Sequence, residues 1–571
     1  MALRLSSLLF ALLLFSMDAW AQSGSNAQNT LLPEINPQDI EIRSEFRARF
    51  PGLRRQPILG FNPKPRVFQI DPNRVPFMES RDDAVASVAI TQLDRPEPPL
   101  RTIMQAPLRR NVYARAGFGN FITPEFEGYF FQSISQKSTL SGNIDYSSSD
   151  GHLDNQLSGF RFLDGDIRFS SKINRQTTIK TNIGGVYDFN RLYNLASLYQ
   201  DVIGSTANKS YSGFNAGTSI NQIKNALEGF SADLQFYSYN AELSAGATDL
   251  GGSSNEIYAS GLVTKYWPGN RLYETISVSA DFKVGSYENS LNSSENLIQI
   301  GLNGEYKRLF NYNLHITANA GLSYVSDGMS KRVFFVPKAL VTYNLKDALI
   351  LKVGLSGSPG IKSLQDHYQK NRFLNNETVL RHNYESKAFA EAAFQLIEGN
   401  RLYGGINYSI TKNYAYFDRK VETRIGQQYQ LFYELNYDKA TEFELYGGVT
   451  QQINPQEFWF DVRFYARRPK LDNGDNIPYE ERIGVNTSVN YKLIDGLLLS
   501  SWIDFVGSRE APSVNEELEA YTLVNVQADY EITPKFGVYA KVLNILGQKY
   551  ELWDGYEERP FQIFGGLILK F

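Results

Sequence analysis

The last eleven residues of the chain, 561–571, alternate strictly between two kinds of side chain. One side carries Phe561, Ile563, Gly565, Leu567, Leu569 and Phe571. Because successive side chains of a strand point to opposite faces, this alternation predicts an amphipathic strand. The strand ends on an aromatic residue at the terminal carboxylate, which is typical of bacterial outer-membrane β-barrels.

The same alternation recurs along the chain from Asn111 onward. In one segment the apolar side carries Ile276, Val278, Ala280, Phe282 and Val284, and the polar side carries Thr275, Ser277, Ser279, Asp281 and Lys283. In a soluble sandwich the apolar sides would face a core, and periodicity by itself does not exclude that arrangement. Two features favour contact with lipid instead. The polar sides carry charges, and the runs reach about ten residues, the length that a tilted strand needs to cross a membrane.

The first 21 residues predict export from the cytoplasm. Arg4 precedes the apolar run Leu8–Phe15, and Ala19-Trp20-Ala21 ends the segment in the order of a secretory signal peptide. The alternative, a membrane anchor, is disfavoured because the run is too short to span a bilayer and Asp18 interrupts its end. We therefore expect the protein in the cell outer membrane, with outer-membrane lipids as partners, since a closed barrel of strands satisfies every backbone amide in lipid.

The composition narrows the classes of function. The chain of 571 residues has 35 Tyr and 37 Phe, which suit the aromatic girdles of a barrel at the membrane interfaces. It has no Cys, so disulfides and thiol chemistry are excluded. The net charge of −4 provides no basic face, and no nucleic-acid partner is predicted.

Tight and long connections alternate between the predicted strands. Tight turns are expected at 174–176, 268–270, 346–347, 398–400, 438–439, 494–496 and 533–535. Long polar loops are expected at 189–209, 239–253, 358–383, 453–481 and 546–560. Short turns at one end and long loops at the other are typical of outer-membrane barrels. The alternation predicts twenty-two antiparallel strands, among them 400–411, 425–437, 441–452 and 482–492.

Residues 22–107 differ from the rest of the chain. They hold 12 of the 22 prolines and no long alternating run. Because proline fixes φ and lacks an N–H, we expect neither a compact sheet nor a helix there. Two interpretations stay open: a periplasmic linker, or an extended segment that packs into the barrel lumen. For the second, the candidate docking residues are Arg43, Arg47, Arg49, Arg54 and Arg55. The predicted organisation is a signal peptide at 1–21, a Pro/Arg-rich extension at 22–107 and a barrel at 108–571.

The stretch 483–571 resembles the C-terminal part of a TonB-dependent receptor barrel. The residues that carry the resemblance are Gly484-Val485-Asn486-Thr487, Asp504-Phe505-Val506-Gly507-Ser508-Arg509, Val542-Leu543-Asn544-Ile545-Leu546-Gly547-Gln548-Lys549-Tyr550-Glu551 and the terminal strand ending in Phe571. The resemblance implies a 22-stranded barrel and passage or uptake of a ligand across the outer membrane. It also implies an N-terminal plug with an energy-coupling box before it. Residues 22–107 are too few and too rich in proline for that domain, so we expect the plug to be missing.

The width of such a barrel requires that its lumen be filled. Twenty-two tilted strands form a ring about 40–45 Å across. The candidate fillers are residues 22–107, long loops folded inward, and a partner such as a periplasmic or surface lipoprotein. The polar side chains predicted to face the lumen are Asp281, Lys283, Glu305, His315, Lys338, Asp529 and Glu531.

No motif predicts catalysis, a cofactor or a metal site. A lone lumenal histidine such as His315 is more typical of a wall residue than of a catalytic base. The segment Asp472-Asn473-Gly474-Asp475-Asn476 resembles a calcium loop but lacks the distal bidentate glutamate at the required offset. Two hypotheses therefore remain. The first is a barrel that passes or takes up a ligand without a self-contained plug, and the second is a structural barrel that scaffolds a lipoprotein or a secretion complex.

Overall fold

The computed structural model describes residues 111–153, 158–193, 207–225, 228–245, 252–271, 273–291, 293–345, 348–397, 399–424, 427–454, 457–511 and 516–571. The predicted signal peptide, the extension 22–107 and its five candidate arginines lie outside these residues. None of the helices in the described ranges has the length and apolar character that crossing a membrane requires.

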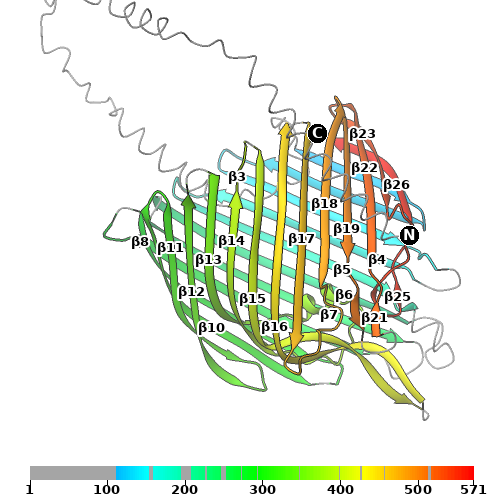
Figure 1. Cartoon of the computed structure of the whole chain (residues 1–571), viewed down its shortest axis with the longest axis horizontal. Coiled ribbons are helices and arrows are strands. Elements are labelled where there is room, and N and C mark those ends of the chain that lie inside the picture. Colours follow the sequence, from blue (N-terminus) through cyan, green and yellow to red (C-terminus); the bar gives the residue numbers. More distant parts are fainter. Residues whose placement is uncertain are drawn as a thin grey trace, which may run out of the picture. The chain divides into compact units, whose positions relative to one another are not determined.

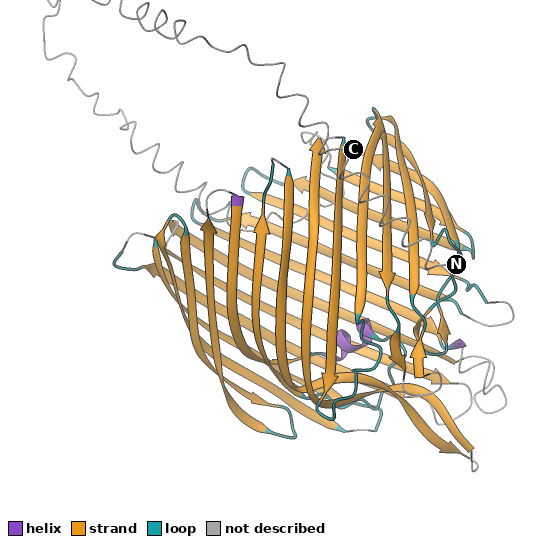
Figure 2. Cartoon of the chain, in the orientation of Figure 1, coloured by secondary structure: helices purple, strands orange, loops and turns teal. Residues whose placement is uncertain are grey.

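Twenty-two antiparallel strands form one closed sheet, which confirms the predicted fold class (Figure 1). Each strand of the sheet pairs with the next barrel strand along the chain. The ring is closed by β1, which pairs with β26 from Tyr113↔Lys570 to Gly119↔Phe564. Two short hairpins, β20–β21 and β24–β25, and the helix α7 (Leu364–Lys370) lie outside this sheet (Figure 2).

The strands of the barrel are β1 (Val112–Gly119), β2 (Thr123–Ser133), β3 (Ser138–Ser149), β4 (Phe160–Lys172), β5 (Thr177–Arg191), β6 (Ala207–Asn225), β7 (Glu228–Ala245), β8 (Gly252–Pro268), β9 (Glu274–Glu288), β10 (Ser294–Asn311), β11 (Leu314–Ser326), β12 (Lys331–Leu345), β13 (Leu349–Ile361), β14 (His382–Phe394), β15 (Asn400–Arg424), β16 (Gln427–Asn454), β17 (Phe458–Leu471), β18 (Ile483–Ile494), β19 (Leu497–Val506), β22 (Tyr521–Thr533), β23 (Phe536–Leu543) and β26 (Gln562–Lys570). The short hairpins are β20 (Arg509–Ala511) with β21 (Glu516–Leu518), and β24 (Glu551–Trp553) with β25 (Tyr556–Glu557).

The two faces of the wall follow the alternation of the sequence. On β9 the apolar Val278, Phe282 and Val284 are exposed on the outer face. Asp281 and Lys283 alternate with them and therefore point inward. The same rule holds on β10, where the outward Leu302 is 59% exposed while Asn303 points inward and bonds to Asp281. The barrel thus presents an apolar outer surface and a polar inner wall.

The connections at one end of the barrel are short, and all of the long connections lie at the other end. We call the end with the short connections, such as 134–137 and 534–535, the turn side. We call the other end, with connections such as 362–381 and 544–561, the loop side. The C-terminal residue Phe571 lies at the turn side, where its carbonyl accepts a hydrogen bond from the Val112 N–H at 2.9 Å.

The predicted number of strands is right, but it results from two errors that cancel. The predicted strands 425–437 and 441–452 are one continuous strand, β16, and the predicted turn at 438–439 is wrong. At this point Thr411 pairs with Ala440 and Tyr414 pairs with Asp438, so two residues of β15 face Lys439 alone. The turn-forming residues therefore mark a β-bulge, where one strand has an extra residue and the ladder continues.

The second error concerns the predicted long loop 453–481. Residues Phe458–Leu471 form β17, which pairs with both β16 and β18. The true loop begins only after Leu471, and the β15–β16 hairpin extends beyond the other strands at the loop side (Figure 1).

Candidate functional site: a loop cap across the mouth of the barrel

The loop between β13 and β14 leaves the wall and forms the helix α7. A capping box starts this helix: the Asp366 N–H donates to the Ser363 hydroxyl at 3.1 Å, and the Ser363 N–H donates to the Asp366 carboxylate at 2.8 Å. These bonds satisfy backbone donors that a helix N-terminus otherwise leaves without partners. Leu364, His367 and Tyr368 of the helix are buried.

Side chains of the inner wall hold the helix. The Glu256 carboxylate of β8 accepts hydrogen bonds from the Leu364 N–H at 3.1 and 2.9 Å. An acidic side chain at a helix N-terminus is favourable because the unpaired N–H groups carry positive partial charge. The Tyr368 hydroxyl, one turn further on, lies 3.2 Å from the Ser254 hydroxyl of the same strand.

A buried lysine holds the segment after the helix. Lys209 of β6 is 3% exposed, and its ammonium donates to the Leu374 carbonyl. The same ammonium lies 3.8 Å from the centroid of the Tyr368 ring, whose π-face attracts a cation. Asn376 follows, and its side-chain amide donates to the Ala241 carbonyl at 3.2 Å and to the Gly252 carbonyl at 2.8 Å.

Two more wall residues hold the ends of the loop. The Lys283 ammonium of β9 donates to the Ile361 carbonyl at 2.8 Å. The Tyr287 hydroxyl, on the same strand, accepts from the Leu380 N–H at 3.0 Å. A loop that begins on β13 and ends on β14 therefore bonds to β6, β7, β8 and β9. It crosses the mouth of the barrel instead of lying along its rim.

The outer part of the β15–β16 hairpin covers this loop. The Asn375 N–H donates to the Tyr433 carbonyl at 2.9 Å, and the Tyr437 hydroxyl donates to the Val379 carbonyl at 2.9 Å. The Tyr433 hydroxyl donates to the Asp554 carbonyl at 3.0 Å, so the hairpin also contacts the connection before β26. In Figure 1 the hairpin bends across the loop-side ends of the strands.

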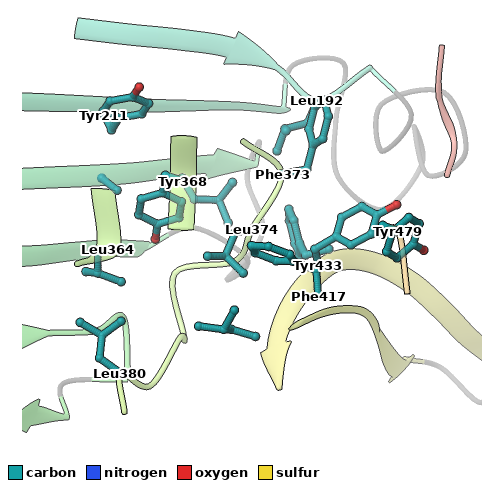
Figure 3. Close-up of a cluster of buried hydrophobic side chains, with 14 of the residues drawn as sticks. Leu192, Tyr211, Leu364, Tyr368, Phe373, Leu374, Leu380, Phe417, Tyr433 and Tyr479 are labelled. Carbon is teal, nitrogen blue, oxygen red and sulfur yellow. The ribbon is translucent and has the colours of Figure 1, made fainter. Parts of the chain in front are cut away.

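We call these three segments together the loop cap: residues 361–381, the hairpin residues 412–419 and 432–439, and residues 544–561. Their apolar side chains form one buried cluster with those of the wall (Figure 3). Leu374 and Leu380 of the cap, Leu297 of the wall and Leu192, the residue after β5, are completely buried. Full burial of one leucine stabilises a structure by about 1.5–3 kcal/mol, so the cap is a packed element.

Burial changes the pKa of a histidine within the cap. His367 is 4% exposed, and its removal from water lowers its pKa from the usual 6.5 to about 3, with Lys362 and Lys370 adding to the effect. Its ring lies edge-on to Phe417 of the hairpin, with 6.3 Å between the centroids. The imidazole is therefore neutral in the closed cap at ordinary pH.

A second histidine, His382, closes the end of the loop. Its Nδ1 lies 2.5 Å from the Asp327 carboxylate, and the His382 N–H also donates to this carboxylate at 3.1 Å. Burial raises the pKa of Asp327, but the bonds from His382 and Ser330 outweigh it, so the pKa lies below its usual value. The ionised carboxylate thus joins the β11–β12 connection to the first residue of β14.

The residues predicted to face the lumen are spread over five strands and do not form one site. The Asp281 carboxylate accepts from the Asn303 amide at 3.1 Å, Glu305 pairs with Lys307 at 2.8 Å, and Asp529 accepts from Gln527 at 2.9 Å. The remaining positions are His315 opposite Thr342, Lys338 opposite Asn319 and Ser356, and Glu531 bonded to Lys570. Within the described ranges, Lys283 is the member of this set that bonds to the cap. That these side chains line a functional lumen stays a prediction.

Sequence reasoning missed Lys209, Glu256 and Tyr368, three of the residues that join wall and cap. The sequence signal that could have identified Lys209 and Glu256 is a charged residue at an inward position near the loop-side end of a strand. As for metals, the described residues contain no group of three or more His, Asp or Glu side chains that could hold an ion.

Comparisons with known proteins show the fold. No family model and no curated protein matches the sequence. Among solved structures, the ferric enterobactin receptor PfeA of Pseudomonas aeruginosa is 12% identical, with a TM-score of 0.64 over 81% of this chain and 80% of that chain. The siderophore receptor PirA of Acinetobacter baumannii is 10% identical, with a TM-score of 0.64 over 82% and 81%. The copper transporter OprC is 11% identical, with a TM-score of 0.62 over 81% and 82%. The comparisons thus confirm the resemblance to TonB-dependent receptors at the level of the fold.

Proposed function

We propose that the protein is an outer-membrane barrel that takes a ligand across the membrane, and that the loop cap is the closed state of its loop-side mouth. The observation that carries the proposal is the path of residues 361–381. This segment crosses the mouth and bonds to wall residues such as Lys209 and Glu256 on strands far from its own. A ligand that enters from the loop side must displace it.

The surface of the barrel supports the membrane location. Outward side chains such as Leu302, Leu322 and Val353 are apolar and more than half exposed. Soluble proteins do not present apolar bands of this kind, whereas a barrel in lipid requires one. The solved barrels with the same fold are named as receptors for ferric enterobactin and other siderophores and as a copper transporter. A role in uptake of a ligand follows from that likeness as part of the proposal.

The cap has the properties of a gate that is closed but displaceable. Its bonds to the wall run largely through single side chains, and it buries a lysine and a glutamate whose charges are costly to remove from water. Elements that open in proteins are drawn from the less stable parts of a structure. The wall, by contrast, is held by ladders of backbone hydrogen bonds between all neighbouring strands.

Planar-bilayer recordings of four variants test the proposal. The variants are the mature chain, a deletion of residues 22–107, a replacement of 364–378 by a short Gly-Ser linker, and both changes together. We expect the double variant to conduct strongly, because the N-terminal extension and the part of the cap that crosses the mouth are then both gone. The single variants show which of the two obstructs the lumen. Heat-modifiable gel migration checks that each barrel is folded.

Silence of all four folded variants would contradict transport. Silence together with a lipoprotein that co-purifies with the mature chain would favour the structural alternative, a barrel that scaffolds a lipoprotein or secretion complex.

A further inference from the structure

The wall has a seam between β12 and β13 at the loop side. These strands pair from Leu345↔Leu349 up to Lys338↔Ser356, and there the ladder stops although both strands continue. β12 goes on to Lys331, paired with β11, and β13 goes on to Ile361, paired with β14. Proline cannot donate to a ladder. Pro337 and Pro359 lie just beyond the last pair, which accounts for the break.

An aromatic side chain crosses this seam. Tyr384 of β14 donates its hydroxyl proton to the Phe335 carbonyl of β12 at 2.8 Å. Its ring also stacks on Phe334, with centroids 5.1 Å apart and planes 17° apart. Gly357 of β13 makes this path available, since a Cβ there would lie 2.5 Å from the Tyr384 hydroxyl.

A cavity of about 340 Å³, which we call the seam pocket, lies beside Tyr384. Its lining includes three cationic side chains, Arg332, Lys412 and Lys439, against a single carboxylate, that of Asp438. Lys439 pairs with Asp472 at 2.7 Å. Among the described residues, Arg332 and Lys412 have no carboxylate partner. The pocket therefore has an excess of positive charge and a size within the usual range of about 300–1,000 Å³ for ligand sites.

The seam lets side chains from both faces of the wall meet in this pocket. Lys412 lies on the same face of β15 as the outward Ile406 and Tyr408, since the ladder with β14 continues without a shift from Ala390↔Ile406 to Tyr384↔Lys412. Arg332 lies on the opposite face of β12 from the outward Val333 and Phe335. It reaches the pocket because β13 has no ladder to β12 at this level.

The apolar outer surface begins directly below the pocket. Tyr408 of β15 and Phe443 of β16 are outward and exposed. Each lies four residues nearer the turn side than the lysine of its strand, Lys412 or Lys439. Further toward the turn side, the same strands form an apolar groove of about 660 Å³ whose outward lining includes Ala390, Ile406 and Leu445. Lys412 is six residues from Ile406, which is about 20 Å along a strand.

We propose that the seam pocket binds the phosphate-bearing headgroup of an outer-leaflet lipid, whose acyl chains run down the outer face toward the groove. The proposal rests on the outer-membrane location proposed above. Arginine and lysine are the side chains that bind phosphate, the first through its planar fork and the second as a point charge. Basic pockets at the edge of a membrane-spanning surface are typical sites of lipid headgroups. The continuous apolar face below the pocket favours a lipid over a soluble anion.

Lipid binding to the purified full chain tests this inference. The probes are lipid A, which carries phosphates on a sugar, a diacylglycerol with the same chains and no phosphate, and soluble glucose 1-phosphate. The variant is R332A/K412A, and the matched control is K137A/K535A, which removes the same charge from exposed lysines in turn-side connections. Native mass spectrometry in detergent measures the bound fraction, and heat-modifiable migration checks the fold.

We expect lipid A to bind the original chain and the control alike, and R332A/K412A to bind it about tenfold more weakly. Diacylglycerol, which has no phosphate, should bind R332A/K412A and the control K137A/K535A equally. Equal binding of lipid A to R332A/K412A and to the control would overturn the proposal. Glucose 1-phosphate binding as tightly as lipid A would also overturn it, because the pocket would then be a site for a soluble anion. The recordings that test the proposed function alter residues 22–107 and 364–378 and leave Arg332 and Lys412 in place, so failure here is distinct from failure of the proposed function.

Discussion

At the turn side of the barrel, turns such as 173–176 are held by neighbouring residues, whereas the loop cap is held by residues far apart in the chain. The Asn174 side chain accepts hydrogen bonds from the Gln176 and Thr177 N–H groups at 2.8 and 2.7 Å within one turn. In the cap, by contrast, Lys209 bonds to a carbonyl 165 residues away, and Tyr193 bonds to the Glu557 carbonyl 364 residues away. The turns are therefore determined locally, and the cap forms only once the wall exists.

The difference also concerns stability. The wall satisfies its backbone through strand ladders and places apolar side chains outside, so it loses little if the cap moves. The cap depends on a few polar bonds and on apolar packing against the inner wall. We therefore expect the two regions to respond separately to mutation and to pH. Four changes test that separation.

The largest effect is expected from a charge on the outer face of the wall. Leu302→Arg places a cation where Leu302 is 59% exposed on the apolar surface. An arginine near the middle of the membrane costs a barrel about 2–4 kcal/mol. The free energy of unfolding in lipid vesicles, measured by urea titration, should fall by that amount.

Ser277→Arg is the matched control on the inner face. Ser277 lies opposite Glu305, so the new guanidinium meets a carboxylate and lumenal water. Its effect should stay below about 1 kcal/mol. Equal effects of the two substitutions would mean that the apolar face does not contact lipid.

The sequence determines the wall more clearly than it determines the cap. Alternation such as that of 275–284 indicates both the strand and its inward face, because a side chain in a strand points to one of only two faces. Asp438-Lys439 misled the prediction because the same residue types occur in turns and at bulges, and only the register of β15 distinguishes them.

Long loops folded inward were one of three predicted fillers of the lumen, but the contacts that hold the cap were not predicted, because they join residues far apart in the chain. An inward Lys209 or Glu256 has the same sequence pattern whether water or a folded loop covers it. Glu256 meets its partner Leu364 over a separation of 108 residues, which no local pattern encodes. The same holds for β17, whose aromatic start at 458–460 shows a strand only when its partners are known.

The second prediction concerns the anchor of α7. Glu256→Leu leaves the Leu364 N–H without its charged acceptor, and hydrogen bonds to charged groups contribute about 1.5–3 kcal/mol. Hydrogen exchange at 362–381 should accelerate accordingly, while exchange in β8 and its neighbours stays unchanged. Acceleration throughout β7–β9 would show that wall and cap unfold together.

The third prediction is that acid loosens the cap. The pKa of His367 is about 3 in the closed cap and returns to about 6.5 once the ring meets water, so the open cap binds more protons between these values. The contribution of His367 to the stability of the cap is complete above about pH 7 and falls as pH decreases through this window, by about 2 kcal/mol at pH 5. Hydrogen exchange at 362–381, corrected for its intrinsic pH dependence, measures the change.

Two substitutions identify the group that titrates. His367→Phe should remove the part of the pH dependence that His367 contributes, since a phenyl ring keeps the apolar contact with Phe417 and binds no proton. His315→Phe, in the wall, should leave it intact. Persistence of the acid effect in His367→Phe would assign the titration to another group.

The smallest effect is expected from Tyr437→Phe, which removes one hydroxyl from the contact between hairpin and loop. That hydroxyl donates to the Val379 carbonyl at 2.9 Å and accepts from the Arg381 N–H at 3.2 Å. Loss of these two neutral bonds, at about 0.5–1.5 kcal/mol each, costs about 1–3 kcal/mol. The rate of hydrogen exchange at 379–381 should rise. The rate at 364–370 should stay unchanged, because Glu256 still holds the helix. If both stretches accelerate equally, the cap opens as one unit, and the hairpin has to lift before α7 can leave the wall.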